Sequence, residues 1–172
     1  GANAMKSGKH IVHYSLELNE AYVGLRYDSI FTGIANQNLK YHKDDVVNEM
    51  EKLKGDLVIK YFPTKTASVN TISAHLKRLT TLGTEVDMVV VDYADILKDT
   101  SNSREVRHAL GNIYEDLRGL AGEFQIPIWT ASQANRSALD EDVIEAQKVS
   151  ESYQKVMTAD FVMSLSRKVE DK

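Results

Sequence analysis

Residues 88–93 read Met-Val-Val-Val-Asp-Tyr, four apolar residues followed by a carboxylate and a phenol. β-Branched side chains favour strands, and a run that is apolar at every position is typical of a parallel strand covered on both faces. An aspartate that ends such a strand lies at the edge of the sheet where ligands gather in α/β proteins. The stretch therefore predicts an α/β fold with a polar site at the carboxyl ends of its strands.

Apolar runs of strand length alternate with helical stretches along the chain. We expect strands at 11–15, 57–62, 88–92, 128–131 and 161–165. This alternation predicts a mostly parallel sheet with helices on both faces. The polar stretch 137–152 lies between the last two strands and is predicted to form a long loop.

Helix start and stop signals separate these strands. The expected helices are 20–27, 42–54, 68–83 and 102–124. Asn19 and Ser68 can cap two of them, because a short polar side chain before an apolar-periodic stretch accepts a bond from the first free N–H groups. For the last helix we expect Asn102 as the N-cap, with Glu105 completing a capping box.

Composition places the chain among ordinary globular domains. Its 172 residues are 42% hydrophobic and 27% charged, so we expect one domain over 1–172. The absence of cysteine excludes disulfides and thiolate metal sites. No apolar stretch approaches the ~20 residues of a membrane helix, and we expect a cytoplasmic protein with no membrane partner. A net charge of −4 means that any contact with nucleic acid is local.

Polar side chains follow three of the predicted strands. Glu17 follows the first, Asp92 ends the third and Gln133 follows the fourth. Because the carboxyl ends of parallel strands share one edge, these side chains are expected to meet. A carboxylate that orients water, a second that holds Mg²⁺ through its waters, and an amide at the terminal phosphate form a set suited to phosphoryl transfer from ATP.

Each of these residues also has a simpler explanation. An aspartate after a strand often caps a loop, and Glu17 can merely precede a helix, where an acidic side chain suits the helix dipole. Gln133 alone carries no signal, so the prediction rests on all three lying at strand ends in one chain order. His10 and His13 alternate with apolar residues and have no convincing third ligand, and we expect them to be surface or core side chains rather than metal ligands.

The strand-end residues also carry a family resemblance. The matching segments are Ser15-Leu16-Glu17, Val91-Asp92-Tyr93, Ser132-Gln133-Ala134-Asn135-Arg136, and Ala159-Asp160 before an apolar run. In this order they resemble the RecA-like motor domain of DnaB-type replicative helicases, over almost the whole chain. Tyr61-Phe62-Pro63-Thr64 is similar to the phage members of that family. The resemblance implies a RecA-like P-loop NTPase core in a homo-hexamer that moves along single-stranded DNA.

Matching positions acquire roles from this resemblance. Glu17 is implied to polarise the attacking water, Asp92 to be the Walker B aspartate that holds magnesium through water, and Gln133 to sense the γ-phosphate of ATP. Arg26 and Arg136 are implied to contact the nucleotide. For Arg26, an ordinary surface salt bridge is an equal alternative.

Two loops, 98–104 and 136–152, are implied to face the channel of the ring. Cations there could meet the phosphates of single-stranded DNA, in contacts that weaken as salt rises. These cations are Lys98, Arg104, Arg107, Arg136 and Lys148. Asp140 and Glu141 lie among them, so a solvated loop is the alternative for each residue.

The chain departs from the family pattern at both ends. It contains no Gly-Lys-Ser or Gly-Lys-Thr phosphate loop, since Gly8-Lys9 is followed by His10. Residues 1–9 are similar to the tail of the helix that would follow that loop, and the chain stops before the basic residues that reach a neighbour's site. We therefore expect a partial domain without the phosphate-loop strand, catalytically inactive and prone to form non-native dimers or larger species through unpaired strand edges.

Two other functions stay open. A RecA-type recombinase or a clock-type ATPase shares the sheet and the aspartate. A non-catalytic RecA-like protein that binds or regulates a helicase ring would also fit. A phosphate loop encoded upstream of Gly1 would favour the motor, whereas a natural start codon near Met5 would favour the non-catalytic protein.

Overall fold

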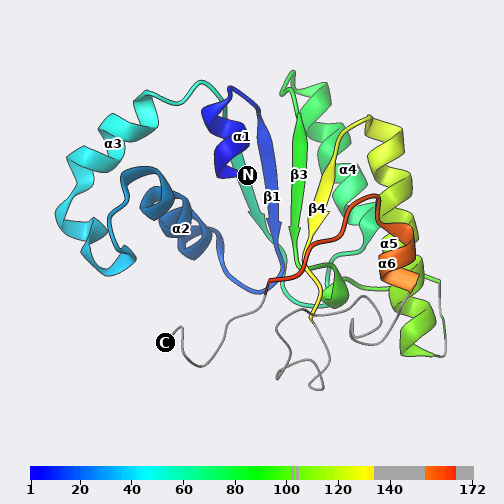
Figure 1. Cartoon of the computed structure of the whole chain (residues 1–172). Helices are drawn as coiled ribbons and strands as arrows, with labels where there is room; N and C mark the ends of the chain where they lie inside the picture. The colour runs from blue at the N-terminus through cyan, green and yellow to red at the C-terminus, as the bar shows by residue number, and fades with distance from the viewer. Residues whose placement is uncertain (102, 104, 134–153, 166–172) are drawn as a thin grey trace.

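A parallel sheet forms the centre of the protein. The computed structural model describes residues 1–101, 103, 105–133 and 154–165. Its strands are β1 (Ile11–Ser15), β2 (Leu57–Tyr61), β3 (Met88–Asp92) and β4 (Ile128–Thr130), in the spatial order β2-β1-β3-β4 (Figure 1). Every pairing among them is parallel, with Ser15 opposite both Tyr61 and Asp92. The carboxyl ends of the described strands therefore share one edge.

Helices cover both faces of this sheet, as the sequence predicts. The helices α1 (Ala2–Lys6), α2 (Glu20–Thr32) and α3 (Lys43–Glu51) lie on one side. The other side carries α4 (Val69–Thr81), α5 (Val106–Phe124) and the short α6 (Gln154–Thr158) (Figure 1). Two 3-10 turns, η1 (Asn36–Tyr41) and η2 (Ala94–Ile96), complete the described elements. None of these helices is long and apolar enough to cross a bilayer.

Side-chain alternation along the strands divides the core into two layers. Val12, Tyr14, Val89 and Val91 face α4 and α5, which contribute buried residues such as Ile72, Leu76, Ile113 and Leu117. On the opposite face, Ile11 packs with Met5 of α1 and with Val23 and Tyr27 of α2. Because both faces are covered, the inner strands are apolar at nearly every position, which is the pattern seen at 88–91.

The predicted caps of α2 and α4 are confirmed. The Asn19 side chain accepts the N–H of Tyr22 at 3.1 Å, as an N-cap does. Ser68 and Thr71 form a reciprocal capping box, in which each side chain accepts the other residue's N–H. Past the end of α4, Gly83 adopts a φ of 82°, a left-handed conformation that glycine accepts without steric cost.

The predicted start of α5 is wrong. The helix begins at Val106 with Glu105 at its N-cap, whereas Asn102 lies outside the described residues. Glu105 is thus the cap itself and not the third residue of a capping box. The physical reason is packing: Val106 is 64% exposed, and the first side chain of this helix to enter the core is Leu110. Tertiary packing of an apolar face supplies most of a helix's stability, and along α5 that packing begins at Leu110.

The strand predicted at 161–165 is also absent. These residues pass beside β4, where the ring of Phe161 lies 6.3 Å from that of Trp129, but they join no ladder of the described sheet (Figure 1). β4 has three residues, so its outer edge offers few groups for pairing. Phe161, Met163 and Leu165 are 70% to 95% exposed. The apolar pattern that predicted a buried strand thus lies on the surface here.

Candidate active site at the carboxyl edge of the sheet

The turn after β1 places Glu17 at the sheet edge. Ser15 is fully buried, and its hydroxyl accepts the N–H of Leu18 at 3.1 Å. The N–H of Leu16 donates to the carbonyl of Asp92 at 2.9 Å, which ties this turn to the end of β3. With Ser15 and Leu16 held inside, the carboxylate of Glu17 is left in solvent.

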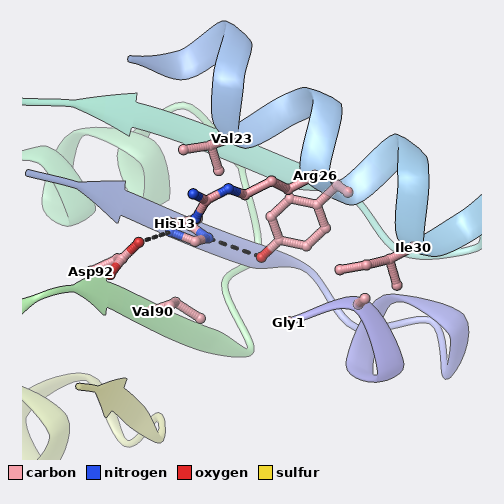
Figure 2. A pocket seen from close by; sticks show the side chains of 9 residues that line it. Gly1, His13, Val23, Arg26, Ile30, Val90 and Asp92 are labelled. Atoms are coloured by element: carbon pink, nitrogen blue, oxygen red, sulfur yellow. Dashed lines mark hydrogen bonds and ion pairs between the residues drawn. The ribbon is translucent and has the colours of Figure 1, made fainter. Parts of the chain in front are cut away.

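Asp92 is the last residue of β3 and lies directly opposite Ser15 in the sheet. Its side chain is 35% exposed, so an oxygen ligand faces solvent at the edge. One carboxylate oxygen lies 4.0 Å from Nε2 of His13 (Figure 2). That separation exceeds hydrogen-bond length, and the carboxylate keeps capacity to accept further bonds.

His13 is a core side chain with one unsatisfied nitrogen. Nδ1 bonds the hydroxyl of Tyr27 at 3.0 Å, while the buried Nε2 has no hydrogen-bond partner among the described residues. Burial lowers the pKa of His13; the carboxylate of Asp92 raises it in opposition, and Arg26 lowers it further. The described residues contain no group of three or more His, Cys, Asp or Glu side chains that could hold a metal ion.

Arg26 reaches from α2 toward His13, over an open hollow of about 260 Å³ (Figure 2). Asp92, Ile30 and Val90 line the same hollow. Arg26, His13 and Asp92 thus border one hollow at this edge. From there Arg26 could contact an anion bound next to Asp92.

Tyr93 lies between Gln133 and the carboxylates of the site, and the sequence analysis assigned it no role. The amide Nε2 of Gln133 donates to the Tyr93 hydroxyl at 3.2 Å. Burial raises the pKa of Tyr93, and the carboxylates of Glu17, Asp95 and Asp92 raise it further. Tyr93 therefore lies in the negative potential of these carboxylates while holding the amide of Gln133. Its position directly after Asp92 was the available signal.

Not every predicted residue joins this cluster. Glu17, Asp92 and Gln133 all lie at the carboxyl edge, and Arg26 lies beside it. Lys98 is exposed just after η2, where its N–H donates to the carbonyl of Ala67 at 2.8 Å. Arg107 lies at the start of α5. Arg104, Arg136 and Lys148 lie outside the described residues. The chemical roles of all these residues stay predictions.

The family model of the DnaB-like helicase C-terminal domain matches residues 2–172. The chain belongs to this family. The match confirms the family resemblance that the strand-end segments indicated.

Several relatives of this chain are described as replicative helicases. A DnaB-like replicative helicase of Enterobacteria phage T4 is 26% identical over 179 residues, covering 95% of this chain and 37% of the relative. The replicative DNA helicase DnaB of Mycoplasma pneumoniae is 27% identical over 133 residues, covering 73% of this chain and 28% of the relative. The chain thus spans between 28% and 37% of the length of these relatives.

Solved structures confirm the predicted fold. One of them, described as an ATPase domain, matches with a TM-score of 0.75 at 20% identity, over 92% of this chain and 60% of that one. A DnaB-like replicative helicase, described together with its interactions with primase, matches equally well over 92% of this chain and 40% of that one. The chain accordingly has the RecA-like α/β fold of these ATPase domains.

Burial of His13 should make stability depend on pH. Its folded-state pKa lies below the 6.5 of an exposed histidine, so the unfolded chain binds more protons between the two values. The contribution of neutral His13 to the free energy of unfolding is complete above pH 6.5, and it is lost as the pH falls toward the folded-state pKa. We expect the wild type to lose more stability than His13→Gln between pH 7.5 and 5.5, by less than about 1.4 kcal/mol per pH unit, the limit for one proton.

Urea unfolding of the 172-residue chain at both pH values measures this effect. Burial also lowers the pKa of His75, which lies on the opposite face of the sheet. His75→Gln is therefore the matched variant: it should reduce the pH dependence of stability separately, and the effects of the two substitutions should add in the double variant. An equal loss of stability in the wild type and in His13→Gln would contradict the description of His13.

Proposed function

We propose that the intact protein is an ATP-driven replicative DNA helicase, a homo-hexamer in which this domain hydrolyses ATP to move along single-stranded DNA. One observation carries the proposal: Glu17, Asp92 and Gln133 lie at or just beyond the carboxyl ends of three parallel strands in a chain of the DnaB-like helicase family. Phosphoryl transfer depends on positioning and charge, and this edge supplies both.

The residues at this edge fit magnesium and ATP. The Tyr93 hydroxyl has a raised pKa partly because Glu17, Asp95 and Asp92 place negative potential around it, and a divalent cation would offset that potential. Asp92 offers an exposed oxygen, the ligand type that magnesium prefers. When bound, magnesium-ATP supplies the phosphoanhydride bond that is cleaved and the cation that offsets its charge.

The chain's own residues divide the work. The turn that buries Ser15 leaves the carboxylate of Glu17 in solvent. There Glu17 would accept a hydrogen bond from the attacking water and orient it. Gln133 has two amide hydrogens, of which the bond to Tyr93 uses one, so the other can reach a terminal phosphate. Arg26 would add positive charge beside Asp92.

Contacts with DNA are assigned to the loops that follow these strands. Lys98 is exposed beyond η2, at the same end of the sheet as Asp92. Together with Arg104, Arg107, Arg136 and Lys148 it would meet the phosphates of single-stranded DNA. Each such contact releases counterions, so binding should weaken as salt rises.

Replacing the proposed catalytic carboxylate should abolish most turnover in the intact protein. We expect Glu17→Gln to lower kcat for ATP by about 100-fold or more, because the amide cannot take up a proton from the attacking water. Glu51→Gln, at the exposed end of α3, is the matched control and should leave kcat unchanged. Steady-state ATPase assays with single-stranded DNA decide the matter, and full activity of Glu17→Gln would refute the assignment.

The 172-residue chain by itself should not hydrolyse ATP. Its sequence contains no phosphate loop, whose backbone N–H groups and lysine supply most of the affinity for phosphates. We expect magnesium-dependent phosphate release no higher than that of a Glu17→Ala variant of the same chain. Turnover that exceeds this control would show that the site is complete without that loop.

The same chain should associate in solution. The outer edge of β4 pairs with no other described strand, and Trp129 and Phe161 lie exposed beside it. Free strand edges and apolar side chains favour contact with a second copy. We expect dimers or larger species by light scattering, and a monomer that persists at high protein concentration would contradict this.

A further inference from the structure

A buried ion pair lies next to the proposed site, in the turn that follows β3. Nζ of Lys155, on α6, is 2.9 Å from Oδ2 of Asp95, in the turn after β3. The side chain of Lys155 is 2% exposed and that of Asp95 is 15% exposed. Lysine is almost never fully buried without a partner, and a buried pair gains little net stability after its desolvation cost. Such a pair calls for an explanation other than stability.

Asp95 is the centre of a closed hydrogen-bond network. Its Oδ1 accepts the hydroxyl of Tyr114 at 2.8 Å, and its Oδ2 accepts both Lys155 and the hydroxyl of Ser132, the latter at 3.1 Å. Ser132 in turn accepts a bond from Nζ of Lys155 at 3.2 Å. Each member restrains the other members, so the network fixes α5, α6 and the loop after β4 relative to one carboxylate.

Two members of the network are close neighbours in sequence of proposed catalytic residues. Asp95 comes three positions after Asp92, and Ser132 directly precedes Gln133. A second link runs alongside, because the hydroxyl of Thr130 donates to the carbonyl of Val91 at 2.8 Å. The ends of β3 and β4 are thereby held together at the point where the site is built.

Lys155 adds a constraint from far along the chain. Ser132 and Lys155 flank the segment 134–153 in sequence, and the 3.2 Å bond between them brings its two flanks to the same carboxylate. Loss of Lys155 would remove the bond that ties α6 to Asp95 and would also take a donor from Ser132, although Gln154 would still hold α6 to Glu115 of α5. The backbone that carries Gln133 would then lose one of its anchors.

We propose that Lys155 is a positioning residue for ATP hydrolysis, which acts through Asp95 and Ser132 to hold Gln133 in register with Asp92. This inference rests on the proposed function of the site. Lys155 itself is buried, and its Nζ bonds Asp95 and Ser132. A misplaced Gln133 would weaken a contact that matters most while the terminal phosphate is being transferred, so kcat should fall while KM for ATP stays nearly constant.

The test uses the intact protein and steady-state ATPase kinetics with single-stranded DNA. We expect Lys155→Met to lower kcat about tenfold with KM for ATP changed less than about twofold. Ser132→Ala removes one hydroxyl and keeps the ion pair, and it should lower kcat about threefold. Lys77→Met is the matched control, because Lys77 forms an exposed ion pair with Glu123 between α4 and α5 and should leave both constants unchanged.

A further variant separates positioning from folding. Lys155→Met leaves Asp95 buried without its cation and can unfold the protein, which circular dichroism will show. The double variant Lys155→Met/Asp95→Asn removes both charges and should be folded, with kcat no lower than that of Lys155→Met, because the two residues act as one unit.

The possible outcomes distinguish this inference from the proposed function. Wild-type protein without ATPase activity would overturn the proposed function and this inference with it. Active wild type, with kcat unchanged in Ser132→Ala and in the folded double variant, would overturn the role of Lys155 alone. A rise in KM at constant kcat would also overturn it, since that pattern reports substrate binding and not the placement of Gln133.

Discussion

Parallel pairing of β1, β3 and β4 is the constraint on which the rest of the structure depends. It puts the carboxyl ends of three strands at one edge, so residues far apart in sequence are brought to that edge by the strand pairing alone. The register makes this specific: Ser15 lies opposite Asp92, and the N–H of Leu16 donates to the Asp92 carbonyl. A shift of β3 by one residue would turn Asp92 to the other face of the sheet.

The chemistry proposed for this edge rests on its distribution of charge. Glu17, Asp92 and Asp95 lie close enough to Tyr93 to raise its pKa together with burial, whereas the one buried cation nearby among the described residues, Lys155, is occupied by Asp95. Asp95 is thus neutralised within the protein, whereas Glu17 is exposed and Asp92 is partly exposed in the hollow that Arg26 also lines. Accessible carboxylates at a shared edge are suited to a divalent cation and a water molecule, which are what phosphoryl transfer requires.

Local sequence signals predicted the framework well. The bounds of β1 and β3 match those expected from their apolar runs, and Ser68 caps α4 as its position indicates. Such features depend on a few neighbouring residues, so they can be inferred without knowing what lies across the fold. The edge location of Glu17, Asp92 and Gln133 was predictable for the same reason, because it requires only parallel strands.

Features that depend on tertiary partners were not predictable. The apolar run 161–165 has the pattern of a strand, but a strand also needs a partner ladder, and the described β4 has only three residues. The unpaired Nε2 of His13 and the Asp95–Lys155 pair arise from contacts between separate elements. Nothing in the residues around Lys155 signals its burial, since an isolated lysine in a polar stretch is expected in solvent.

The central claim is that this edge holds the metal of a bound nucleotide, and the most direct test is a crystal structure of the intact protein with Mn²⁺ and a non-hydrolysable ATP analogue. Anomalous scattering locates manganese without ambiguity. The account predicts a manganese peak about 4 to 5 Å from the Asp92 carboxylate, the distance spanned by one coordinated water, with Glu17 facing the terminal phosphate. A nucleotide whose metal lies away from Asp92, with Glu17 in solvent, would contradict it.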